Sequence, residues 1–326
     1  MSVSIAGNFR RYMHKIPPFE TDDSWILELR GEKNPVDPLK PYALNTELER
    51  TRPGRIEEVA TIFLTNRECA FHCLMCDLWK NTTDIPVPVG AIPAQIKWAL
   101  TQLTPVKHLK LYNNGNFFDK QAIPAEDFAE ITSLVAGFES LIVESHPRLI
   151  DERCLEFSDQ IKPELQMAIG LETVNPQILS KLNKRMDIVD FERAVRFLYK
   201  HNIPTRTFIL LRPPFLTENE GVQWAMRSID YAFETGVECI VIIPTRAGNG
   251  AMDWLQSNRY FSPPSISSLE QVLGYGIQLN KGRVFADLWD IEIFSDCSKC
   301  FDSRTKRLTD MNLNQHVLPP VNCTCG

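Results

Sequence analysis

The sequence predicts an α/β fold in which helices cover a parallel sheet. Throughout residues 59–289, short apolar runs rich in β-branched residues alternate with segments that carry apolar residues at helical spacing. Glycine or polar residues follow several of these runs, and parallel sheets carry their chemistry at the carboxyl ends of their strands. The 326 residues, of which 44% are hydrophobic, suffice for one large domain with appendages or for two domains.

The expected strands are short and separated by helical segments. They comprise residues 59–65, 107–113, 140–145, 165–171, 205–211, 238–243 and 283–288. Helical spacing predicts helices over 124–138 and 188–201, and Thr217 with Glu220 forms a capping-box pattern that opens another helix. The stretch therefore contains six βα units with right-handed crossovers, and a complete eight-unit barrel does not fit it.

Residues 1–55 differ from the rest of the chain in composition. Six prolines stand there among many charges, which predicts an irregular arm with a short helix near residues 20–29. Cysteines are grouped again near the other end of the chain. We therefore divide the chain into an N-terminal arm (1–55), a core (56–290) and a Cys-rich tail (291–326).

Composition indicates where the protein works. A membrane span would need a run of about eighteen apolar residues, and the sequence has none. The N-terminus lacks the apolar region of a secretory signal. The nine cysteines are too few and too unevenly spaced for a disulfide scaffold, and the C-x₂-C and C-x-C groupings among them indicate metal or cluster ligation in a reducing cytosol. We therefore expect a cytoplasmic protein, and the net charge of −6 argues against a large autonomous nucleic-acid surface.

The most informative stretch is residues 61–79, which place Cys69, Cys73 and Cys76 in a C-x₃-C-x₂-C array directly after a predicted strand. Three thiolates cannot close a four-coordinate structural zinc site alone. They can hold three irons of a 4Fe-4S cluster, whose fourth iron then stays open to a small molecule. The alternative is that these are three reduced structural cysteines.

This loop resembles the signature of the radical S-adenosylmethionine (radical SAM) superfamily. The resemblance implies a partial (β/α)₆ barrel in which SAM chelates the open iron. It also implies that a reductant such as flavodoxin or ferredoxin feeds the cluster, and that SAM then splits to methionine and a 5′-deoxyadenosyl radical, which takes hydrogen from the substrate. The protein's task is to hold and shield these groups.

The resemblance also implies where SAM is bound. The family contacts SAM from the ends of the second, third and fourth barrel strands, where this chain has Asn114 and Gly115, Glu144 and Ser145, and Glu172. The alternatives are an ordinary Asn/Gly turn at 113–116 and a structural ion pair for Glu172. A buried Glu172 needs a partner, for which we expect an arginine at 206 or 212, or SAM itself.

Four further segments resemble a narrower group. They are GLET at 170–173, the Asn183-Lys184 pair, LLRPPFLTE at 210–218 and ESHP at 144–147. Within the elongator-subunit-like and methylthiotransferase-like branch, they are most similar to the archaeosine-synthase-partner type of radical SAM protein. This implies modification of a tRNA base, with tRNA or a tRNA-binding partner protein. The alternatives are a radical SAM enzyme for a small metabolite or peptide, and a zinc-binding interaction protein without catalysis.

The tail carries a second group of thiols. Cys297 and Cys300 form a C-x₂-C pair, and Cys323 and Cys325 form a C-x-C pair. Four thiols in two pairs can close a tetrahedral zinc site, and they can also hold an auxiliary Fe–S cluster. Basic residues beside the first pair can contact a phosphate backbone: Lys299, Arg304, Lys306 and Arg307. The remaining two cysteines, at 154 and 239, lie in apolar settings typical of buried structural cysteines.

Overall fold

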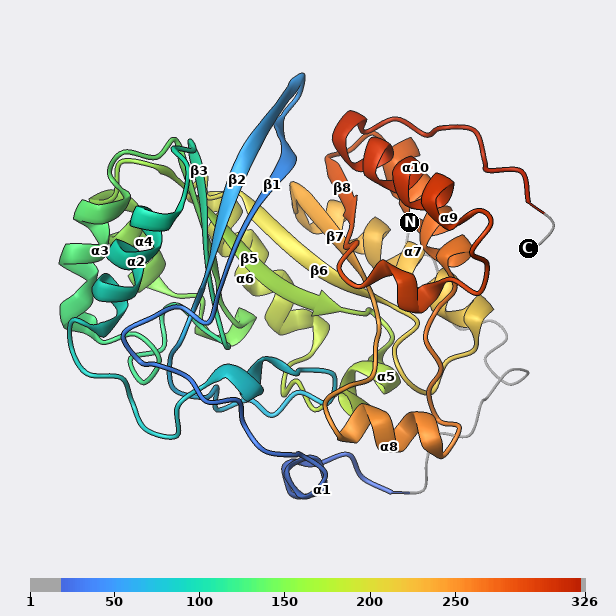
Figure 1. Ribbon diagram of the computed structural model, residues 1–326, viewed down its shortest axis with the longest axis horizontal. Coiled ribbons are helices and arrows are strands. Elements are labelled where there is room, and N and C mark those ends of the chain that lie inside the picture. Colours follow the sequence, from blue (N-terminus) through green and yellow to red (C-terminus); the bar gives the residue numbers. More distant parts are fainter. Residues whose placement is uncertain (1–18, 324–326) are drawn as a thin grey trace.

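The computed structural model describes residues 19–323 and contains one eight-stranded sheet whose strands follow the order of the chain (Figure 1). The first two strands are antiparallel, and the second to the eighth are parallel. The strands are β1 (Ala43–Arg52), β2 (Arg55–Leu64), β3 (His108–Asn113), β4 (Ser140–Glu144), β5 (Glu164–Glu172), β6 (Thr205–Leu211), β7 (Cys239–Pro244) and β8 (Arg283–Ala286). All seven predicted strands are present, which confirms the α/β prediction.

Helices join the parallel strands and cover the outer face of the sheet (Figure 1). The helices of the described residues are α1 (Asp23–Glu28), α2 (Ala91–Gln102), α3 (Phe128–Val135), α4 (Glu152–Gln160), α5 (Pro176–Lys181), α6 (Ile188–Lys200), α7 (Glu218–Thr235), α8 (Ala251–Ser257), α9 (Ile266–Gln278) and α10 (Phe301–Asn314). Six helical crossovers connect the seven parallel strands, as predicted. Within residues 19–323 no ladder joins β8 to β1, so the curled sheet is an open half-barrel.

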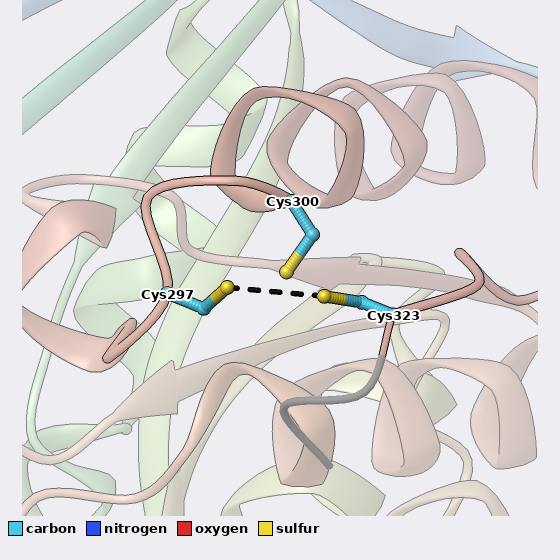
Figure 2. A group of neighbouring side chains, drawn as sticks. All are labelled: Cys297, Cys300 and Cys323. Atoms are coloured by element: carbon cyan, nitrogen blue, oxygen red, sulfur yellow. Dashed lines mark hydrogen bonds between the residues drawn. The ribbon is translucent and has the colours of Figure 1, made fainter.

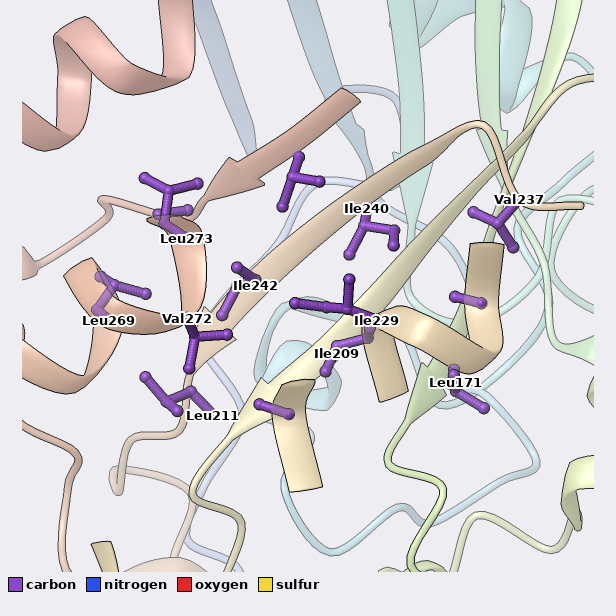
Figure 3. Close-up of a cluster of buried hydrophobic side chains, with 14 of the residues drawn as sticks. Leu171, Ile209, Leu211, Ile229, Val237, Ile240, Ile242, Leu269, Val272 and Leu273 are labelled. Carbon is purple, nitrogen blue, oxygen red and sulfur yellow. The ribbon is translucent and has the colours of Figure 1, made fainter. Parts of the chain in front are cut away.

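The hydrophobic core lies between the sheet and these helices. Figure 3 shows one part of it, where Ile240 and Ile242 of β7 pack with Ile229 of α7 and Leu273 of α9, all fully buried. Successive side chains of a strand point to opposite faces. The residues between these apolar positions therefore face the concave side of the half-barrel, where the polar chemistry is found.

Charged side chains fill the concave face near the amino ends of the parallel strands. Glu49 of β1 accepts hydrogen bonds from Lys110 Nζ at 2.6 Å and from an Arg206 guanidinium nitrogen at 3.1 Å, and all three residues are buried. Burial raises the pKa of Glu49, but the two cations together hold it well below its usual range. Arg283 of β8 donates to the backbone oxygen of Arg50 at 2.8 Å. Side chains thus link the two edge strands that no ladder joins.

The N-terminal arm differs from the expectation in one place. The short helix near residues 20–29 is present as α1, but residues 43–52 form β1 instead of irregular chain. This strand is rich in charged residues, and its inward carboxylates are compensated by cations of β3, β6 and β8. Residues 1–18 of the arm lie outside the described part of the chain, and the three-part domain division remains a prediction.

The predicted helices are found with small shifts. The segment 124–138 contains a 3₁₀ turn followed by α3, and 188–201 contains α6. The capping box is confirmed: Thr217 Oγ1 accepts from the backbone N–H of Glu220 at 3.2 Å, and Glu220 accepts from the backbone N–H of Thr217 at 2.8 Å. Among the described residues, no helix combines the length and apolarity that crossing a membrane requires.

Candidate functional site

Three short helices, α1, α5 and α8, lie together over the carboxyl ends of the parallel strands (Figure 1). Leu74, in the loop that carries the three predicted cluster cysteines, is fully buried and packs in one cluster with Ile26 of α1, Ile178 of α5 and Met252 of α8. The cysteine loop is therefore held between the edge of the sheet and a covering layer of helices.

Side-chain amides from distant segments fix the path of the cysteine loop. Asn249, buried just after β7, donates its amide hydrogens to the carbonyl oxygens of Leu74 at 2.8 Å and Cys76 at 3.0 Å. Asn183 likewise donates to the carbonyl of His72 at 2.9 Å. Side-chain amides that bind backbone carbonyls order a loop with no regular structure of its own. Sequence reasoning missed Asn249, because its partners are more than 170 residues away.

The three thiols are partly buried in a setting that disfavours their charge. Burial raises the pKa of Cys69, Cys73 and Cys76 to about 12 in each case. They are therefore protonated in the metal-free chain, and metal binding would release those protons. The three Sγ atoms of this loop do not all lie within 4.8 Å of one another, whereas two other groups of possible metal ligands in residues 19–323 do. This wider spacing suits separate metal ions of a cluster better than one tetrahedral ion, whose thiolates lie about 3.8 Å apart for bonds of about 2.3 Å.

The loop after β3 lies directly against the first of these thiols. Gly115 has a left-handed φ of 103°, and a Cβ there would overlap Cys69 Sγ. Asn114 Oδ1 accepts from the backbone N–H of Cys69 at 3.3 Å, and Asn116 Nδ2 donates to Cys69 Sγ at 3.4 Å. The predicted residues Asn114 and Gly115 are thus beside the cysteine loop. Asn116, which we did not single out, joins them.

The end of β4 carries the next two predicted residues. Burial raises the pKa of Glu144 to about 8, although a backbone N–H of Asn113 and the charge of Lys184 oppose the shift. Ser145 is buried beside it. His146 stacks on Phe71 of the cysteine loop with ring centroids 3.9 Å apart.

His146 links two segments of the site. Its Nε2 lies 2.9 Å from the carbonyl oxygen of Lys184, and burial lowers its pKa to about 3. The neutral imidazole therefore joins the cysteine loop to the segment after β5 and carries no charge at neutral pH.

Glu172, at the end of β5, forms a buried ion pair. Its Oε1 accepts from Lys184 Nζ at 2.6 Å, and both residues are less than a tenth exposed. The expectation of an arginine partner was wrong: Arg206 binds Glu49, and Arg212 binds Glu218. Burial lowers the pKa of Lys184, but Glu172 and then the thiol of Cys73 raise it above its usual value overall.

Several buried polar atoms at this edge of the sheet have no hydrogen-bond partner within the described part of the chain. They belong to residues at or just after strand ends: Thr65, Asn113, Asn114, Ser145 and Thr245. Buried polar groups in native proteins are almost always paired. A polar ligand at the carboxyl edge, such as SAM, would satisfy them, so the residues present fit such a group.

The tail cysteines form a separate group. The Sγ atoms of Cys297, Cys300 and Cys323 lie within 4.8 Å of one another (Figure 2). The fourth predicted ligand, Cys325, lies outside the described residues. Cys154 and Cys239 are fully buried in the core, as predicted.

The fold defines the class of protein. No family model matches the chain. It superposes on Elp3 of the archaeon Methanocaldococcus infernus with a TM-score of 0.52 and 12% identity, over 78% of this chain and 63% of that one. It superposes on Streptococcus suis SuiB bound to S-adenosylmethionine with a TM-score of 0.50 and 10% identity, over 69% of this chain and 49% of that one. The fold is therefore that of the radical SAM enzymes.

Sequence comparison narrows the resemblance. The chain is 26% identical over 211 residues to archaeosine synthase subunit beta of Thermococcus kodakarensis, covering 62% of this chain and 65% of that protein. It is 25% identical over 351 residues to an uncharacterized protein of Methanocaldococcus jannaschii, covering 100% of this chain and 93% of that protein. The chain has the fold of the radical SAM enzymes and is similar in sequence to archaeosine synthase beta subunits, which confirms the resemblance recognised in the sequence.

Proposed function

We propose that this protein is a radical SAM enzyme whose cysteine loop holds a 4Fe-4S cluster through Cys69, Cys73 and Cys76. The observation that carries the proposal is the seating of these three thiols at the carboxyl edge of a radical SAM-type half-barrel, beside buried polar atoms that lack a partner within residues 19–323. When bound, the cluster and SAM supply reductive cleavage of SAM and a radical that abstracts hydrogen from a substrate.

The chain's own residues bind and orient these groups. Gly115 leaves room beside Cys69, where any side chain would collide with the thiol. Asn114 and Ser145 offer buried polar atoms to SAM, and Glu144 and Glu172 offer carboxyl groups at neighbouring strand ends. Because its pKa is raised to about 8, Glu144 is mostly protonated at neutral pH and could donate a hydrogen bond to SAM. Glu172 pairs with Lys184 and holds that cation close to the cluster loop.

The test is metal and sulfide analysis with electron paramagnetic resonance on protein reconstituted without oxygen. We expect about four irons and four sulfides at this site, and a reduced signal that shifts when SAM is added. Cys73→Ala should lose the cluster and SAM cleavage, whereas Cys154→Ala, in the core, should keep both. Full cluster absorbance and SAM cleavage in Cys73→Ala would sink the proposal. Zinc without iron would favour the non-catalytic zinc-binding protein.

We further propose that the substrate is a base in tRNA and that a partner subunit shares the work. The support is the similarity to proteins named archaeosine synthase subunit beta, whose name implies another subunit. The matching region spans 65% of that protein. The net charge of this chain is −6, and this negative charge fits a complex in which the partner supplies much of the RNA binding.

The substrate test measures 5′-deoxyadenosine released from SAM with and without bulk archaeal tRNA. We expect release to rise with tRNA, to fall when the tRNA is first digested, and to be absent in Cys73→Ala. Retention on tRNA should weaken steeply as salt rises, because phosphate contacts release counterions. SAM cleavage that is unaffected by tRNA but stimulated by a peptide or small metabolite would support the alternative substrate class instead.

A further inference from the structure

The thiols of the tail meet although they are far apart in the sequence. Cys297 lies in the loop before α10, Cys300 is the N-cap of that helix, and Cys323 lies in the segment that returns after the helix. Figure 2 shows the three side chains pointing toward one another from these places. Convergence of three cysteines across 26 residues is unexpected for structural cysteines, which are usually dispersed in apolar cores.

The sulfur spacing matches one metal ion. Cys297 Sγ lies 3.8 Å from Cys323 Sγ, and Cys300 Sγ lies within 4.8 Å of both. A tetrahedral zinc ion with bonds of about 2.3 Å requires thiolates about 3.8 Å apart. A disulfide requires sulfurs about 2.05 Å apart, which these atoms do not approach.

An auxiliary Fe–S cluster fits this spacing less well. In a cubane, each thiolate binds a different iron, so the sulfurs stand farther apart than the ligands of one ion. The contrast with Cys69, Cys73 and Cys76 supports this distinction, because those three thiols do not form such a close group.

The surroundings hold the three thiols in place. Arg304 and Arg307 of α10 bind Glu270 of α9 at 2.9 Å and 3.0 Å, and these side chains are largely buried. Arg307 also donates to the carbonyl oxygens of Leu318 at 2.7 Å and Pro319 at 2.8 Å, which holds the returning segment along α10. Because these contacts occupy Arg304 and Arg307, the expectation that they bind a phosphate backbone loses support.

We propose that Cys297, Cys300 and Cys323 are three ligands of a mononuclear, tetrahedral zinc site that fastens the C-terminal segment to α10. The sequence offers a fourth thiol, Cys325, just beyond the described residues. Zinc bound by cysteine thiolates from two segments holds those segments together, which is a structural role. The site is separate from the proposed SAM site and does not depend on it.

The test is the metal content of the full chain purified without oxygen, with zinc, iron and sulfide measured on the same sample. We expect about one zinc per chain. Cys297→Ser should lose the zinc and keep the iron, whereas Cys73→Ala should lose the iron and keep the zinc. Cys239→Ser, a buried cysteine in β7, is the matched control and should keep both metals.

Two further measurements guard against misfolding of the variants. Cobalt added to zinc-depleted wild-type protein should give thiolate-to-cobalt charge-transfer absorption and the d–d bands of a tetrahedral site. Zinc removal should speed amide hydrogen exchange in residues 315–323 several-fold and leave exchange in β3 to β7 unchanged. Iron and sulfide near eight per chain, about half of it lost in Cys297→Ser, would overturn the proposal in favour of an auxiliary cluster. Protein that carries iron but takes up neither zinc nor cobalt would overturn it as well, as would a Cys297–Cys323 disulfide.

Discussion

Lys184 Nζ donates a 2.6 Å hydrogen bond to Glu172 Oε1, and this buried ion pair lies directly against Gly170 of the same strand as Glu172. A Cβ on residue 170 would overlap both the carboxylate and the ammonium group. The glycine of the GLET segment is thus explained by a side-chain pair, which occupies the space that its missing side chain would need.

Lys184→Met should therefore damage both stability and the proposed SAM site. Removing one partner of a buried pair leaves an uncompensated charge and costs about 3–5 kcal/mol. Thermal unfolding of cluster-loaded protein measures the loss. Lys97→Met is the control, because Lys97 and Glu130 form an exposed pair worth less than about 1 kcal/mol. Equal effects of the two variants would contradict a special role for the Lys184 pair.

Gly115→Ala should impair cluster assembly. The new Cβ would overlap Cys69 Sγ, and the left-handed φ of 103° adds about 1–3 kcal/mol of strain for alanine. We expect a several-fold lower yield of iron per chain after reconstitution. Gly137→Ala is the control, since a Cβ there meets no atom within 4 Å. Normal iron content in Gly115→Ala would show that the loop after β3 can move away from the cysteine loop at little cost.

Asn249→Ala should loosen the cysteine loop without removing any thiol. The change leaves the carbonyls of Leu74 and Cys76 without this donor and removes the cap on Met252 N–H at 2.8 Å. Losing such buried hydrogen bonds costs about 1–3 kcal/mol. Iron release to a chelator should become several-fold faster than in wild type, while exposed Asn258→Ala should leave the rate unchanged. An unchanged rate in Asn249→Ala would mean that the loop is held by other contacts.

Glu144→Gln should change how stability depends on pH. The pKa of Glu144 is about 8 in the folded chain, against an ordinary value of 4.5 that we assign to the unfolded chain. Between these values the folded state keeps a proton that the unfolded state releases, so stability falls as pH rises. The contribution is at most about 1.4 kcal/mol per pH unit.

The glutamine variant lacks this proton. We therefore expect the melting temperature of the variant minus that of wild type to increase from pH 5.5 to pH 7.5, with both proteins free of SAM. A difference that stays constant across this range would show that Glu144 has an ordinary pKa.

Glu49→Gln should strongly destabilise the folded protein. It would leave Lys110 and Arg206 buried with less compensation, at a cost of about 3–5 kcal/mol. Glu47→Gln is the matched control. Glu47 also pairs with Lys110 but its side chain is 49% exposed, so its loss should cost less than about 1 kcal/mol. Similar unfolding curves for the two variants would contradict the importance of the buried network.

Local patterns predicted much of the fold. The seven parallel strands were visible because each is a short apolar run, and α7 was visible because Thr217 and Glu220 form a cap within one turn of helix. The cysteine loop was visible because its thiols are close in sequence. Asn114 and Gly115 were found through the family resemblance, and the structure brings them against Cys69.

Other features depended on contacts between distant segments. The strand β1 was missed because its charged inward face is stabilised by cations of distant strands, among them Lys110 and Arg206. The partner of Glu172 was misassigned because the turn after α5, rather than a neighbouring strand, delivers Lys184.

By itself, the sequence determined the α/β class, the count of six βα units and the position of the cysteine loop, since these depend on residues close together in the chain. Only the tertiary structure decided which buried charges pair, that Asn249 anchors the loop, and that Cys323 meets Cys297 at 3.8 Å. Such contacts depend on how the crossovers and the curl of the sheet bring distant segments together. The periodicity of neighbouring residues does not predict which distant segments meet.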